Sequence, residues 1–170
     1  DGSSFLNDSD AMEEVEEVLL DYQSRTSVRL ARILLKDYWK KDVRITDARE
    51  DFREQIKGGV AGVVIGDRAF EQRNISKYMY DFGEAWKNLT GLPFVYAAWV
   101  SNKPLDKNFI ASFNEATALG LQQLDEVLKQ NPYSLFDLKT YFTRHMSYRL
   151  DDDKRKGLQL FLQKIAAYQL

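Results

Sequence analysis

Three hydroxyl side chains and an arginine stand together after a short apolar run. Ser24, Arg25, Thr26 and Ser27 follow the segment 18–20, and the periodicity of the next residues predicts a helix. The first N–H groups of a helix lack partners within it, and the helix dipole places partial positive charge there. Hydroxyls at such a position can hold an anion. The sequence therefore predicts a carboxylate-binding turn at residues 24–27, named the hydroxyl turn below.

A helix cap is the simpler interpretation of the same residues. Ser and Thr are favoured at the N-cap, where the side chain accepts a hydrogen bond from a free backbone N–H. One cap satisfies only one or two of these N–H groups, so three hydroxyls beside Arg25 leave a ligand role open. Asp67 has the same two interpretations, either as the cap of a short helical segment at 68–72 or as a ligand contact.

The elements that would position these residues alternate along the first half of the chain. The pattern of apolar residues predicts strands over 15–21, 43–45 and 61–65, and helices over 26–39 and 49–57. Such alternation predicts an α/β fold with a parallel sheet. Ligands bind beyond the carboxyl ends of parallel strands, and both the hydroxyl turn and the pair Gly66 and Asp67 fall at that edge.

The second half of the sequence is mostly helical. A short strand is predicted near 78–80 and a helix over 84–89, followed by a strand over 94–100 that includes Phe94 and small alanines. Helices are predicted over 106–129, over 135–143 and from about 151 to 168. We therefore divide the chain into a flexible lead-in (1–14), an α/β substrate-binding lobe (15–100) and a helical C-terminal region (101–170).

Composition excludes several functions. The 24 basic and 26 acidic residues are interspersed and give a net charge of −2, so the sequence predicts no basic surface that would bind nucleic acid. The chain has no cysteine and one histidine, which leaves no zinc constellation and no histidine-based triad. The longest apolar runs fall far short of the roughly 20 residues that span a bilayer. The glycines match neither the dinucleotide fingerprint nor the phosphate loop.

Three segments together resemble the chorismate dehydratases of the futalosine route to menaquinone. They are DYQSRTS at 21–27, GVVIGD at 62–67 and YDFGEAWKNLTGLPFVYAAW at 80–99. The resemblance implies a periplasmic-binding-protein-like (type II) lobe followed by C-terminal helices, in a cytoplasmic enzyme that binds its substrate between two lobes. It also implies loss of water from chorismate to give 3-enolpyruvylbenzoate, without metal or organic cofactor. The substrate contacts that we assign are Ser24, Arg25, Thr26, Ser27, Gly66, Asp67 and Phe94.

The sequence also departs from this family. Members carry an early Ser-Tyr-Leu-Asn-like motif and a later serine-rich stretch, both associated with the reacting centre, and the first has no counterpart here. We therefore expect the family's N-terminal lobe segment to be absent, and we assign no catalytic residue.

Three functions follow from these observations. The first is a lyase that acts on chorismate. The second is a non-catalytic solute-binding module for a small carboxylate. The third is a structural fragment that self-associates through the surface left by a missing lobe.

Overall fold

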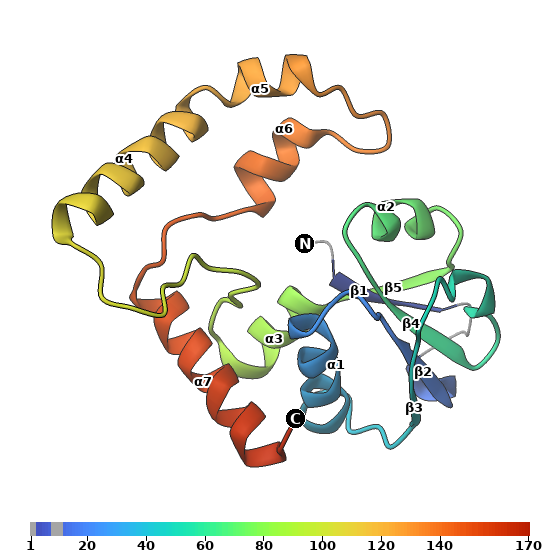
Figure 1. Ribbon diagram of the computed structural model, residues 1–170. Helices are drawn as coiled ribbons and strands as arrows, with labels where there is room; N and C mark the ends of the chain where they lie inside the picture. The colour runs from blue at the N-terminus through green and yellow to red at the C-terminus, as the bar shows by residue number, and fades with distance from the viewer. Residues whose placement is uncertain (1–2, 8–11) are drawn as a thin grey trace. The chain divides into compact units, whose positions relative to one another are not determined.

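The computed structural model describes residues 3–7 and 12–170 (Figure 1). The chain forms two compact units. The first unit combines Asp1–Tyr96 with Arg149–Leu170, and the second unit is Ala97–Tyr148. The sheet and every candidate site residue belong to the first unit.

The sheet of the first unit has five strands in the order β3-β2-β4-β1-β5. The strands are β1 (Ser3–Asn7), β2 (Glu17–Leu20), β3 (Arg44–Asp47), β4 (Val60–Ile65) and β5 (Tyr78–Asp81). β2 pairs in parallel with β3 and with β4, whereas β1 pairs antiparallel with β4 and β5. The predicted α/β class with parallel strands is therefore confirmed for β3, β2 and β4.

Successive residues of β2 supply two different hydrophobic clusters. Val18 and Leu20 pack with α1 (Thr26–Asp37), α3 (Phe82–Thr90) and α7 (Asp152–Tyr168), whereas Leu19 packs with Phe52, Ile56 and Ala69. The second cluster involves the 3-10 turn η2 (Arg53–Gln55) and α2 (Asp67–Arg73). Because side chains alternate across a strand, one face of the sheet lies under α1 and the other under η2 and α2.

Strand β1 lies within the range for which we expected a flexible lead-in. The structure places Ser3–Asn7 between β4 and β5, paired on both sides. Backbone hydrogen bonds to two neighbours stabilise such a strand whatever its side chains, so a polar composition does not reveal it. Met12–Glu14 forms the 3-10 turn η1, and the other residues of the lead-in, 1–2 and 8–11, lie outside the described part of the chain.

Two predicted elements differ in the structure. Residues 94–100 form no strand, because Phe94 packs its ring against Trp86 and Phe161 instead of pairing with a neighbouring strand. The helix predicted over 49–57 is reduced to η2. The spacing of Phe52 and Ile56 is compatible with a helix, but here the 3-10 turn between them brings both side chains onto β4.

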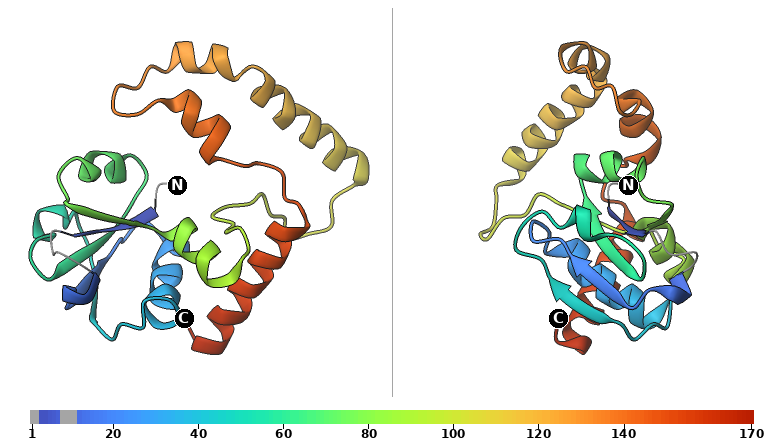
Figure 2. Two further views of the ribbon diagram at one scale, coloured as in Figure 1. Left: turned by 180° about the vertical axis from the view of Figure 1, so that it is seen from behind. Right: turned by 90° about the vertical axis from the view of Figure 1, so that its right-hand side faces the viewer.

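The second unit consists of α4 (Lys107–Gln122), α5 (Leu124–Gln130), α6 (Leu138–Thr140) and the π-helix η3 (Tyr141–His145), shown in Figure 2. The helix predicted over 106–129 is interrupted at Gln123, whose backbone leaves the helical region. No residue of Ala97–Tyr148 is buried. Among the described residues, none of the helices has the length and apolar character needed to cross a bilayer.

Helix α7 belongs to the first unit and packs with α1. Asp37 of α1 accepts hydrogen bonds from Lys164 and from the hydroxyl of Tyr168. The structure thus separates α7 from the rest of the region 101–170, for which helical periodicity alone predicted no division.

A methyl group at Gly157 should destabilise the protein. A Cβ at this position would come far inside van der Waals distance of the Pro93 carbonyl oxygen, and that oxygen belongs to the backbone. We expect Gly157→Ala to lower the free energy of unfolding by about 1–3 kcal/mol, measured by urea denaturation. Gly120→Ala in α4 is the control, because no atom lies within 4 Å of its added Cβ. Equal stabilities of the two variants would contradict this packing.

The exposed apolar side chains of the second unit should cause self-association. Trp99 and Val100 are 84% and 91% exposed, and Phe109, Ile110 and Leu119 of α4 are also exposed. Large apolar surfaces of this kind associate in water. We expect light scattering to show oligomers that weaken in the variant Phe109→Ser/Ile110→Ser. A monomer at high protein concentration would count against this prediction.

Candidate functional site

The hydroxyl turn begins helix α1, as the sequence predicts. Ser24 Oγ accepts a hydrogen bond of 3.0 Å from the backbone N–H of Ser27. This contact is the capping interaction of the simpler interpretation, so Ser24 has a structural role. Arg25 makes no side-chain capping bond, and its side chain is exposed. A ligand role at the turn is therefore assigned first to Arg25 and Thr26, and it stays a prediction.

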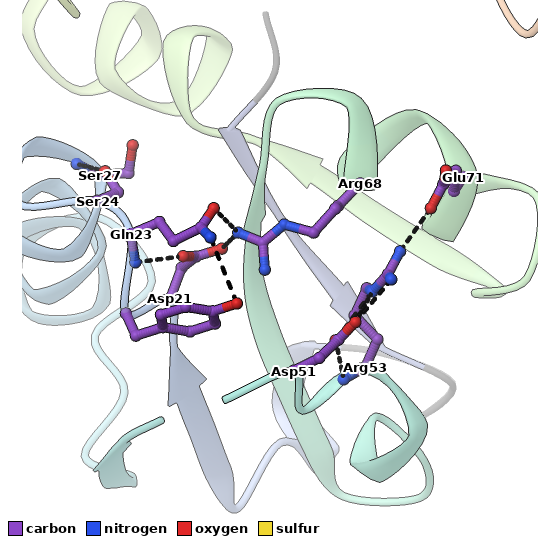
Figure 3. Close-up of polar contacts among 9 residues, drawn as sticks. Asp21, Gln23, Ser24, Ser27, Asp51, Arg53, Arg68 and Glu71 are labelled. Carbon is purple, nitrogen blue, oxygen red and sulfur yellow. Dashed lines mark hydrogen bonds and ion pairs between the residues drawn. The ribbon is translucent and has the colours of Figure 1, made fainter. Parts of the chain in front are cut away.

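A buried ion pair joins the ends of β2 and β4. The carboxylate of Asp21, fully shielded from solvent, accepts a hydrogen bond of 2.6 Å from Arg68 Nη2. Its other oxygen accepts the backbone N–H of Gln23 at 2.7 Å (Figure 3). Arg68 Nη2 also donates to Gln23 Oε1 at 3.0 Å. A buried carboxylate is costly unless it is paired, so Arg68 is what allows Asp21 to lie here.

Gly66 allows β4 to turn directly into α2. Its φ of +62° and ψ of −149° lie in a region that side chains with a Cβ rarely adopt. Asp67 is then the first residue of α2 and is exposed, and Arg68 follows. Since Arg68 contacts Asp21 and Gln23, the structure brings Gly66 and Asp67 to the same edge as the hydroxyl turn.

Phe94 lies in a cluster of aromatic rings. Its ring centroid is 4.6 Å from Tyr96, 4.8 Å from Phe161 and 5.4 Å from Trp86. Phe161 and Trp86 belong to the main hydrophobic core. Phe94 thus has a packing role, and its assignment as a substrate contact stays a prediction.

A second arginine lies on the same side of the sheet as α2. Arg53 Nη1 donates to Glu71 at 2.6 Å, and its Nη2 donates to Asp51 at 2.6 Å (Figure 3). Hydrogen bonds from the guanidinium lower the pKa of Asp51 to about 2. Arg53 therefore connects the segment after β3 to α2.

The sequence interpretation missed Asp21, Arg53 and Arg68. Asp21 and Arg68 could have been found from the sequence. They carry opposite charges and follow two predicted parallel strands, whose carboxyl ends meet at one edge of the sheet. Arg53 gave no such signal, since its contact with Glu71 depends on the fold. In the described part of the chain, no group of three or more His, Asp or Glu residues is arranged to hold a metal ion.

Comparison with known proteins gives two findings. A family model described as "Menaquinone biosynthesis" matches residues 3–167. A chorismate dehydratase from Thermus thermophilus is 26% identical over 177 residues, which cover 91% of this chain and 65% of that protein. The chain thus spans about two thirds of the length of this relative.

Removal of the buried carboxylate should destabilise the protein strongly. Asp21→Ala leaves the Arg68 charge without its partner, and we expect a loss of about 3 kcal/mol in urea denaturation. The double variant Asp21→Asn/Arg68→Gln should recover part of this loss, because neither charge then remains. Arg32→Gln is the control, since Arg32 pairs with the exposed Asp47 and should cost less than about 1 kcal/mol. A loss in Asp21→Ala as small as in the control would contradict a buried pair.

The titration of Asp51 should depend on Arg53. NMR should give the Asp51 carboxyl a pKa of about 2, and Arg53→Gln should raise this pKa toward 3.8. Because the pKa is lowered in the folded protein, the pair contributes stability above about pH 4 and loses it as the pH falls toward 2. An unchanged pKa in Arg53→Gln would exclude the contact.

Proposed function

We propose that this chain, which belongs to the menaquinone biosynthesis family, forms the substrate-binding lobe of a chorismate dehydratase. The observation that carries the proposal is the edge where β2 and β4 end. There the hydroxyl turn, Gly66 and Asp67 are held together by the Asp21–Arg68 pair. The proposal includes a periplasmic-binding-protein-like lobe and a cytoplasmic location, both implied by the sequence resemblance.

The strand order supports the proposed type of lobe. β2, β3 and β4 follow one another through helical or 3-10 connections, as βα units do. β1 is inserted antiparallel between β4 and β5, so it is not part of this series. At its N-terminal end, Ser3 pairs with Ile65, and the chain therefore enters β1 at the edge of the sheet that carries the hydroxyl turn.

The chemistry of chorismate fits such an edge. Chorismate carries two carboxylates and a hydroxyl group on a ring that becomes aromatic when water is lost. A ring proton leaves to a base, its electron pair forms the new ring double bond, and the C–O bond to the hydroxyl breaks. Binding the dianion in one orientation lowers the barrier to this step, and hydrogen-bond donors such as the Thr26 hydroxyl and the Arg25 guanidinium can serve that purpose.

A solute-binding module for a small carboxylate is the second candidate. It is favoured by the residue types of the hydroxyl turn, whose hydroxyls and arginine can bind a carboxylate but include no base. Both candidates use the same hydroxyl turn, and they differ only in whether the bound ligand reacts.

Thr26→Ala distinguishes a ligand site from a helix cap. If Thr26 binds a carboxylate, its loss should weaken chorismate binding by about 1–3 kcal/mol in calorimetry, the usual contribution of a hydrogen bond to a charged group. Thr46→Ala is the matched control, because the Thr46 hydroxyl donates to Glu17 instead. An unchanged Kd combined with a lower melting temperature in Thr26→Ala would assign this residue to the helix terminus alone.

Turnover tests whether this chain by itself contains the reacting centre. We expect the 170-residue chain by itself to convert negligible chorismate, because none of its residues matches the implied Ser-Tyr-Leu-Asn-like motif. Absorbance at the wavelength of the aromatic product measures this. Conversion above the uncatalysed rate would show that the chain contains the base and that the catalytic groups lie among its own residues.

A further inference from the structure

We propose that Arg53 is a positioning residue for the hydroxyl turn. It holds α2 through Glu71, and α2 in turn holds Asp21 and Gln23 through Arg68. The inference rests on the proposed function, and it adds the residues that fix the carboxylate-binding edge.

The first link joins the segment after β3 to α2. Arg53 uses Nε and Nη2 to bind Asp51, at 2.9 and 2.6 Å, and Nη1 to bind Glu71 at 2.6 Å. Both ends of the guanidinium are engaged, so its direction is fixed. The Arg53 side chain is 25% exposed and that of Glu71 is 51% exposed, so this ion pair is partly exposed to water. Arg53 therefore fixes the position of Glu71 relative to β3.

The second link joins α2 to the hydroxyl turn. Glu71 and Arg68 are three residues apart on α2, a helix of seven residues. So short a helix has little stability of its own, and its position depends on tertiary contacts. Arg68 Nη2 donates two hydrogen bonds, one to Asp21 and one to Gln23. Nη1 is buried without a partner among the described residues. One nitrogen thus makes both contacts, so a shift of α2 weakens both of them.

These two sets of contacts join the segments that follow β2, β3 and β4 at one edge of the sheet. Asp51 and Arg53 follow β3, Arg68 and Glu71 follow β4, and Asp21 and Gln23 follow β2 (Figure 3). The backbone of Gln23 is bound to Asp21 and immediately precedes Ser24. A loss of either link should therefore loosen the hydroxyl turn while the core remains intact.

Hydrogen exchange of backbone amides tests the proposal without a ligand. The reporters are the N–H groups of Gln23 and Ser27, which donate to Asp21 and Ser24. The reference is the set of α7 amides, which report global opening. In Arg53→Gln and in Glu71→Gln we expect the reporters to exchange about 3- to 5-fold faster relative to the reference, the range for a partly exposed ion pair. In Arg53→Lys the reporters should exchange at a rate between that of these variants and that of the original chain.

Arg44→Gln is the matched control. Arg44 also makes a 2.7 Å ion pair, with Glu17, but both residues lie where β2 and β3 begin, at the opposite edge of the sheet. This variant should leave the reporters unchanged relative to the reference. Equal acceleration of reporters and reference in Arg53→Gln would overturn the proposal, because it would show a role in stability alone. Unchanged reporters would overturn it as well.

Calorimetry with chorismate separates this inference from the proposed function. Faster exchange of the reporters without any binding of chorismate by the original chain would refute the proposed function and support the positioning role of Arg53. Binding of chorismate with unchanged reporters in Arg53→Gln and Glu71→Gln would refute the positioning role alone.

Discussion

The buried carboxylate of Asp21 is the constraint on which the arrangement of the site depends. It lies at the end of β2, inside the protein, where an unpaired charge would cost several kcal/mol. Arg68 is its partner, so α2 must begin directly beyond β4, and Gly66 provides the backbone conformation for that turn. The hydroxyl turn begins three residues after Asp21, so its position depends on this pair.

The sequence was sufficient where one face of an element is apolar and its neighbours are local. β2, α1 and β4 lie where periodicity predicts them, because the apolar side chains of α1 repeat on one face and those of β2 and β4 are buried on both faces of the sheet. The sequence was insufficient where contacts between distant segments determine the structure. β1 depends on hydrogen bonds to β4 and β5, and Phe94 depends on rings from α3 and α7. At the site, the residue types of the hydroxyl turn were evident, whereas the contact of Arg53 with Glu71 spans 18 residues and has no local pattern.

The helix cap at Ser24 is compatible with the proposed ligand role of the hydroxyl turn. Ser24 caps the helix by accepting the N–H of Ser27. The proposed anion contacts are then Arg25 and Thr26, which make no side-chain capping bond. A binding edge with this division of roles orders a carboxylate without contributing a base. The proposed dehydratase would then place its base outside this turn, and the chain spans 65% of the related chorismate dehydratase. The first unit would supply binding and orientation, and the second unit, which has no buried residue, would contribute surface for association.

The most direct test of the central claim is an NMR titration of the labelled chain with chorismate, in which the backbone amide shifts are followed. The claim that the edge after β2 and β4 binds a carboxylate predicts the largest, saturable shifts at residues 24–27 and 66–68. Shifts confined to other parts of the chain, or none at saturating chorismate, would contradict it.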